Sequence, residues 1–209
     1  MRPATVERDV LAMLTDTDER AQIRNGFDTL MSEIISGSYI FNWSIAGYFK
    51  APSFNTLQVA MTPAELNPRA EQYSAGEDGE PIIWRPFSAS SNGYIDLKQL
   101  DESVSSDNAI VTARVWFESD GSDIAYTFGA DDASRVMLNN KILYEDHTNH
   151  SANPLQHVGT MKPRQGLNLL TVSIENGSGG YGFYLRLFDD EVLESISTTP
   201  PETISERSR

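Results

Sequence analysis

The sequence predicts a mainly β protein, an antiparallel β-sandwich preceded by a short N-terminal helical pair. The hydrophobic period changes from about 3.6 to 2 near residue 37, and no helical pattern separates the strand-like segments that follow. With 209 residues, of which 39% are hydrophobic and 10% aromatic, the chain can bury a full core. We therefore expect one globular domain with appendages.

Residues 1–37 carry the helical pattern. Their apolar side chains recur at steps of three and four residues: Val6, Val10, Leu11, Leu14, Ile23, Phe27, Leu30, Met31, Ile34 and Ile35. Asp16 and Glu19 have the spacing of a capping box, which starts a second helix, and Gly37 can end it. The apolar stripe predicts docking onto a core or onto a partner.

Residues 38–189 carry the strand pattern. Alternating, β-rich segments lie between Gly, Asn, Asp, Ser and Pro clusters: "SYIFNWSIAGYF", "AIVTARVWFE", "DIAYTFGA", "SRVMLNNKILY", "NLLTVSIEN" and "YGFYLRLFD". Between residues 51 and 109 the strand signals are weaker, near "LQVAM", "IIWRPF" and "YIDL". Residues 190–209 are polar and contain prolines, which predicts a disordered tail or linker.

A β-hairpin is predicted around Asn139 and Asn140. Both residues tolerate positive φ, as the two-residue type I′ turn requires, and apolar residues flank them on each side.

Charge and composition exclude several classes of protein. The 30 acidic and 16 basic residues give a net charge of -14, which would repel nucleic acid. No cysteine is present, so thiolate metal sites and thiol nucleophiles are excluded. The N-terminus lacks the apolar stretch of a signal peptide, and no run of 18 apolar residues predicts membrane insertion. No nucleophile, phosphate-loop or dinucleotide motif appears, so we do not expect an enzyme.

The order of motifs in the β portion carries a resemblance. The chain contains, in sequence, "FNWSIAGYF", "MTPAEL", "IIWRPF", "GYIDL", "GADDASRVMLNNKIL" and "GLNLLTVSIENGSGGYGFYLRL". This succession over residues 38–189 resembles the galactose-binding-like β-sandwich modules of large multidomain bacterial proteins, and more weakly the PA14 module. The resemblance implies a jelly-roll sandwich, a non-catalytic accessory role in carbohydrate binding, and an extracellular or periplasmic location.

The adjacent aspartates Asp131 and Asp132 have three interpretations. In an extended strand their side chains would point to opposite faces, which disfavours a catalytic acid and base. Together with loop carbonyls and Asn139, they could bind calcium through oxygen ligands. Alternatively, they accept hydrogen bonds from backbone N–H groups in turns. Calcium is thus a possible structural cofactor, and no other is expected.

Aromatic and histidine residues supply the remaining candidates. Tyr181 lies between glycines in "NGSGGYGFY", where it is either presented to a ligand or packed on its own loop. The tryptophans Trp43, Trp84 and Trp116 lie in strand-like segments, which favours the core over a sugar platform. His147, His150 and His157 lack helical ligand spacing, so we expect loop histidines more than a metal site.

Two functions from different classes follow. A binding module would hold a neutral glycan with the loops at one end of the sandwich or with a sheet face. A structural subunit of a larger assembly would instead contact protein partners through the helical pair and the sheet surface.

Overall fold

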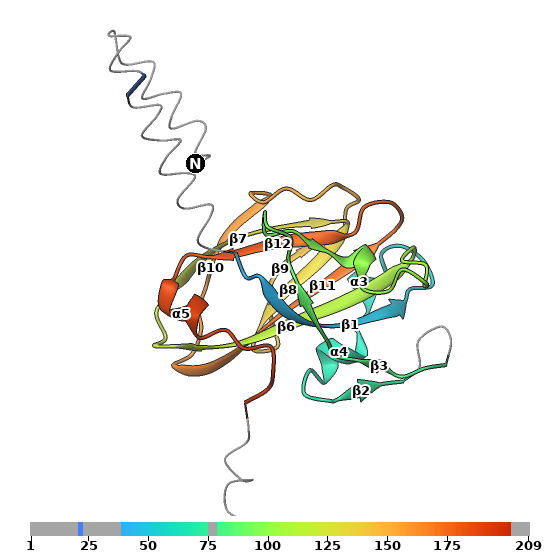
Figure 1. Ribbon diagram of the computed structural model, residues 1–209, viewed down its shortest axis with the longest axis horizontal. Coiled ribbons are helices and arrows are strands. Elements are labelled where there is room, and N and C mark those ends of the chain that lie inside the picture. Colours follow the sequence, from blue (N-terminus) through green and yellow to red (C-terminus); the bar gives the residue numbers. More distant parts are fainter. Residues whose placement is uncertain (1–20, 23–38, 75–78, 202–209) are drawn as a thin grey trace, which may run out of the picture. The chain divides into compact units, whose positions relative to one another are not determined.

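The structure is a computed structural model that describes residues 21–22, 39–74 and 79–201 (Figure 1). Residues from Tyr39 onward belong to one compact unit. Ala21 and Gln22 are helical, and the remainder of the predicted helical pair lies outside the described residues.

Two antiparallel sheets form the unit. The larger sheet has the strand order β4 (Arg85–Ser88), β1 (Asn42–Lys50), β6 (Ala109–Ser119), β11 (Gly166–Asn176), β8 (Ala133–Leu138), β9 (Lys141–Asp146). The smaller sheet has the order β10 (His157–Met161), β7 (Ile124–Asp131), β12 (Gly182–Leu187), β5 (Ile95–Asp96). A separate ribbon pairs β2 (Gln72–Tyr73) with β3 (Ile82–Ile83).

The core lies between the inner faces of these two sheets. On β11 the inward residues are Leu170, Val172 and Ile174, and on β12 they are Phe183, Leu185 and Leu187. Trp43 is fully buried and meets the Phe183 ring edge-on, with 5.1 Å between ring centroids. The predicted antiparallel sandwich is therefore confirmed.

The hairpin between β8 and β9 is also confirmed. Leu138 pairs with Lys141, and the two turn residues, Asn139 and Asn140, have φ values of 51° and 63°. These left-handed conformations are the ones that a two-residue type I′ turn requires.

A covering segment, residues 51–74 and 79–84, lies over the outer face of the larger sheet. It contains α3 (Thr56–Val59), α4 (Pro63–Leu66), β2 and β3 (Figure 1). The predicted strand at "LQVAM" is wrong, because its first half is the helix α3. The buried Glu175 of β11 accepts hydrogen bonds from the backbone N of Thr56 and of Leu57, both at 2.8 Å. This carboxylate satisfies the first N–H groups of a helix and so selects the helical turn.

The chain beyond β12 departs from the predicted tail. Residues Asp190–Glu194 form α5, which Asp189 caps by accepting a hydrogen bond from Val192 N at 3.0 Å. Ser197 then pairs with Trp116 through two backbone hydrogen bonds of 2.8 Å. Because Val192 is buried, apolar packing anchors this stretch despite its polar composition. Among the described residues, no helix is long and apolar enough to cross a lipid bilayer.

Candidate loop-end site

Asp131 and Asp132 lie where the chain passes from one sheet to the other. Asp131 is the last residue of β7 and pairs with Gly182, whereas Ala133 already pairs with Glu175 in the larger sheet. The peptide bond between the two aspartates is cis. Both carboxylates face the loop 177–180: Asp132 Oδ2 accepts from Gly177 N, and Asp131 Oδ2 lies beside Gly180. The expectation that they point to opposite faces is wrong, because strand alternation does not extend across a residue that changes sheets.

Electrostatics at this pair disfavours two full negative charges. Burial raises the pKa of Asp131, and the charge and hydrogen bond of Asp132 raise it further, while His150 and the backbone of Ala152 act in the opposite direction. Asp132 is 2% exposed and accepts a hydrogen bond from Gly177 N at 3.0 Å. Asp132 therefore has the backbone-capping role that was one of the predicted interpretations of the pair.

The loop between β11 and β12 closes over these carboxylates. A Cβ placed on Gly180 would overlap the Asp131 carboxylate, and one on Gly177 would lie 3.5 Å from Asp132 Oδ2. At Gly180 a side chain would have to displace the Asp131 carboxylate, whereas the distance at Gly177 is an ordinary contact. Gly180 thus lets the loop backbone lie close to Asp131.

Asn176 adds an amide oxygen that the sequence analysis missed. It is fully buried, and its Nδ2 donates to Ser106 O at 2.9 Å, yet its Oδ1 has no hydrogen-bond partner in the described ranges of the chain. Asn176 directly precedes Gly177, whose N–H binds Asp132. An asparagine at the end of a strand and before a glycine was the available signal, but it is equally typical of an ordinary turn.

These oxygens fit a hard cation better than a transition metal. No group of three or more His, Cys, Asp or Glu side chains suited to a metal occurs in the described part of the chain. Calcium differs from zinc in accepting amide and backbone carbonyl oxygens beside carboxylates. The carboxylate oxygens of the two aspartates and Asn176 Oδ1 are atoms of the kinds that calcium accepts. We refer to Asp131, Asp132, Asn176 and the loop 177–180 as the loop-end site.

Tyr181 does not belong to a ligand-binding surface. It is fully buried, its ring stacks on Tyr48, and its hydroxyl lies 3.2 Å from Ala109 O and 3.0 Å from Ile174 O. The glycines beside it allow the ring to turn into the sandwich instead of presenting it to solvent. The interpretation of Tyr181 as a sugar-binding residue is therefore wrong.

Asn139 is likewise remote from the aspartates. It follows β8, whereas Asp132 precedes it, so a strand of six residues, about 20 Å long, separates them. Its side chain donates to Asn168 Oδ1 at 2.8 Å and accepts from Leu169 N at 3.0 Å. Asn139 anchors the hairpin to β11 and is not a calcium ligand.

The tryptophans and histidines have mainly structural surroundings. Trp43 and Trp116 are buried, as predicted, and Trp84 is partly buried. His157 stacks on Tyr144 with 4.0 Å between ring centroids, and burial lowers its pKa. His150 lies 3.2 Å from Asp146 Oδ2. The histidines therefore do not form a metal cluster among the described residues.

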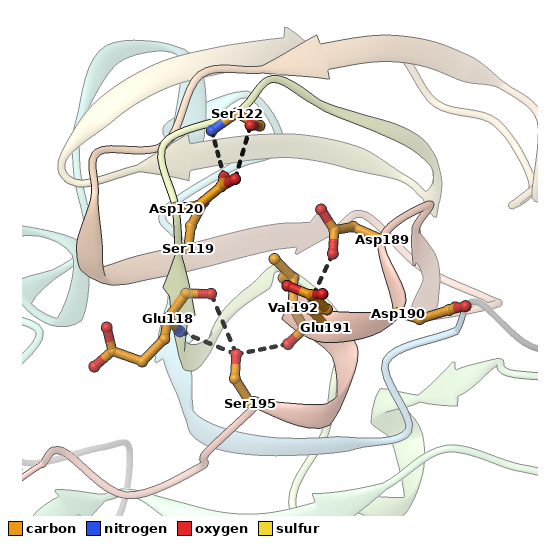
Figure 2. A pocket seen from close by; sticks show the side chains of 9 residues that line it. All are labelled: Glu118, Ser119, Asp120, Ser122, Asp189, Asp190, Glu191, Val192 and Ser195. Atoms are coloured by element: carbon orange, nitrogen blue, oxygen red, sulfur yellow. Dashed lines mark hydrogen bonds between the residues drawn. The ribbon is translucent and has the colours of Figure 1, made fainter.

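An acidic cavity of about 510 Å³ lies between the end of β6 and α5 (Figure 2). Two of its carboxylates are used in local structure: Asp120 accepts from Ser122, and Asp189 caps α5. Ser195 Oγ joins the two sides by accepting from Glu118 N at 3.0 Å. These bonds give Asp120 and Asp189 structural roles.

Comparison with known proteins gives only distant similarity. The sequence matches no protein-family model and no curated protein. Among solved structures, the PA14 sugar-binding domain from an RTX adhesin is 16% identical, with 70% of this chain and 90% of that chain covered and a TM-score of 0.33. A family 35 carbohydrate-binding module from an environmental isolate is 12% identical, with 53% and 80% covered and a TM-score of 0.33.

Glycosidases also match part of the chain. The α-xylosidase from Xanthomonas citri is 16% identical, with 53% of this chain and 13% of that chain covered and a TM-score of 0.39. The chain spans only 23% and 25% of two β-galacturonidase structures from Eisenbergiella tayi. Both kinds of module that the sequence resembles are thus among the solved structures matched, but TM-scores below 0.5 assign no function to this chain.

Proposed function

We propose that this chain is a non-catalytic module that binds a neutral glycan at the loop-end site with the help of calcium. The observations that carry the proposal are two adjacent carboxylates facing the loop 177–180, and the buried amide oxygen of Asn176, which has no partner among the described residues and directly precedes the Gly177 N–H bound by Asp132. Leaving a buried amide oxygen unpaired is costly, and a cation bound there would remove that cost.

The chemistry of the site suits sugar hydroxyls. A bound calcium ion would supply positive charge to which neighbouring hydroxyl oxygens of a sugar can coordinate. Asp131 and Asp132 would hold that ion and, with the exposed loop at Ser178 and Gly179, leave one side open to solvent. The site lies in loops at a sandwich end, where binding residues are commonly positioned by a rigid scaffold.

An aromatic partner for the sugar is also present. Tyr94 is partly buried, and the Asp131 carboxylate is close enough to add to the effect of burial in raising the Tyr94 pKa. Its ring lies 4.9 Å from that of Tyr184, centroid to centroid. We assign to Tyr94 the stacking role that the sequence analysis gave to Tyr181.

Calcium titration of a double variant tests the proposal. Calcium should raise the melting temperature of the wild type by mass action, and Asp131→Asn with Asp132→Asn should abolish the effect. Asp123→Asn is the matched control, because Asp123 is 54% exposed and lies 3.7 Å from Lys162 at the surface. Glycan binding is then measured by applying the protein to a glycan array, once in the presence of calcium and once in the presence of a chelator. Equal glycan binding under both conditions, or no response to calcium, would overturn the proposal.

The raised pKa of Asp131 predicts the pH dependence. Because the pKa is higher in the folded state than in the unfolded state, the stability it contributes is present at low pH and is lost as pH rises through the folded pKa. Without calcium, mild acidification should therefore stabilise the wild type, and Asp131→Asn should reduce this gain. Calcium affinity should fall over the same range, since protons compete for the carboxylate. Urea unfolding and calorimetric titration at several pH values measure both effects.

The assembly hypothesis stays a prediction, because most of the helical pair on which it depends lies outside the described residues.

A further inference from the structure

Two buried arginines on the outer face of the larger sheet have very different partners. Arg135 and Arg114 are each 4% exposed. Arg135 contacts the carboxylates of Glu65, at 3.2 Å, and of Glu145. Arg114 donates to the carbonyl of Pro68, and its Nε has no hydrogen-bond partner. No ion pair involves Arg114 among the described residues.

The surroundings of Arg114 leave most of its buried positive charge without compensation. Its Cζ lies 3.8 Å from the centroid of the Trp84 ring, which compensates part of the charge but supplies no acceptor in the guanidinium plane. Burial lowers the pKa of Arg114 to about 10; nearby Arg69 acts in the same direction and Tyr73 in the opposite one. Charged side chains are rarely buried unless they are paired. Acidic residues outnumber basic ones in this chain, whose net charge is -14, so the lack of a carboxylate beside Arg114 among the described residues is unusual.

Trp116 adds a second unpartnered donor beside Arg114. The two residues are two positions apart on β6, so both project to the outer face, while Val115 and Phe117 enter the core. Trp116 is 3% exposed, and its Nε1 has no hydrogen-bond partner. The Arg69 guanidinium covers the ring, with Cζ 4.4 Å from the centroid.

We propose that Arg69, Trp84, Arg114 and Trp116, the arginine–tryptophan cluster, bind a small carboxylate anion. Guanidinium groups and an indole N–H are donors without acceptor capacity, and a planar carboxylate offers two acceptor oxygens to them. Arg69 is the point of entry, because its side chain is exposed and its residue lies in a turn between α4 and β2. On this proposal, Arg69 leaves its contact with the Trp116 ring as the anion reaches the buried donors.

This site is independent of the loop-end site. Asp131 and Asp132 stand at the crossing from β7 to β8, whereas the cluster lies under the covering segment on the outer face of β6. The proposal therefore holds or fails separately from calcium and glycan binding.

Titration with sodium acetate tests the cluster, with sodium chloride at equal ionic strength as the salt control. Sodium glucuronate and glucose form a charged and a neutral pair of the same size. Acetate and glucuronate should give saturable changes in tryptophan fluorescence and in the NMR signals of the indole N–H of Trp116, and glucose should give none.

Single-residue variants test whether the carboxylate binds at the arginine–tryptophan cluster. Arg69→Met should weaken carboxylate binding about tenfold or more, as expected when one charged partner is removed. The matched control, Arg164→Met, alters an exposed arginine of the β10–β11 loop and should bind as the wild type does. Asp131→Asn with Asp132→Asn should also bind normally. Arg114→Met is a second test, but it can affect folding, and exposed Arg69 avoids that difficulty. A response to acetate no larger than to chloride, or an equal response in Arg69→Met, would show that the cluster only fastens the covering segment.

Discussion

At the scale of single residues, hydrogen-bond partners decide which polar groups are structural. The Tyr181 hydroxyl reaches two carbonyls inside the sandwich, whereas Asn176 Oδ1, Arg114 Nε and Trp116 Nε1 are buried without partners. Because buried polar atoms are nearly always paired, these three atoms are the ones from which the two binding proposals are argued.

Tyr181→Phe separates a structural role from a binding role. The variant loses the hydroxyl but keeps the ring, so unfolding should require about 1 kcal/mol less. Tyr181→Ala should lower the free energy of unfolding by about 3 to 5 kcal/mol, because it leaves a cavity in the core. Urea denaturation measures both values, with the partly exposed Tyr184→Phe as the control. Glycan affinity of Tyr181→Phe should equal that of the wild type; a selective loss of binding at unchanged stability would restore the surface role.

At the scale of elements, the covering segment depends on charged groups of the sheet beneath it. Glu175 accepts the first two N–H groups of α3, and Glu65, within the capping box of α4, pairs with Arg135. These short helices would not be stable alone, so their conformation is fixed by contacts distant in sequence.

Glu175→Gln tests that dependence. The amide retains one acceptor oxygen and adds an NH2 group where an acceptor stood, so one N–H of α3 is left unpaired at a cost of about 1 to 3 kcal/mol. We expect faster hydrogen exchange at Thr56 and Leu57, together with a lower urea midpoint. The exposed Glu80→Gln is the control. Unchanged exchange in Glu175→Gln would mean that apolar packing alone holds the helix.

At the scale of the whole molecule, the charge of -14 distinguishes the two proposed ligands. A neutral glycan forms no ion pair, whereas a carboxylate gains attraction from the arginine–tryptophan cluster and is repelled by the protein as a whole. Salt therefore acts differently on the two sites.

The salt dependence of binding checks this distinction. Raising NaCl from about 0.1 M to about 1 M shortens the screening length from about 10 Å to about 3 Å. With calcium kept saturating, glycan affinity should change less than about twofold, and acetate affinity should decrease as chloride competes and screens the arginines. Isothermal titration calorimetry measures the glycan affinity and the acetate affinity. A steep loss of glycan affinity would indicate that the glycan itself is charged.

The sequence by itself determined the sandwich, several of its strands and the type I′ hairpin. These features follow from local rules: alternation of apolar residues at period two, and two adjacent asparagines that accept positive φ. The aspartate pair was also found from sequence, because two carboxylates before a hairpin are visible without a structure.

Only the tertiary structure decided how those residues are used. The crossing between sheets brought Asp131 and Asp132 together, the fold turned Tyr181 inward, and Glu175 made a helix from a segment that alternates like a strand. Arg114 and Arg135 look alike in sequence, yet within the described part of the chain Arg135 pairs with carboxylates and Arg114 with none. Such differences depend on contacts between residues far apart in the chain, which local periodicity and turn preference do not encode.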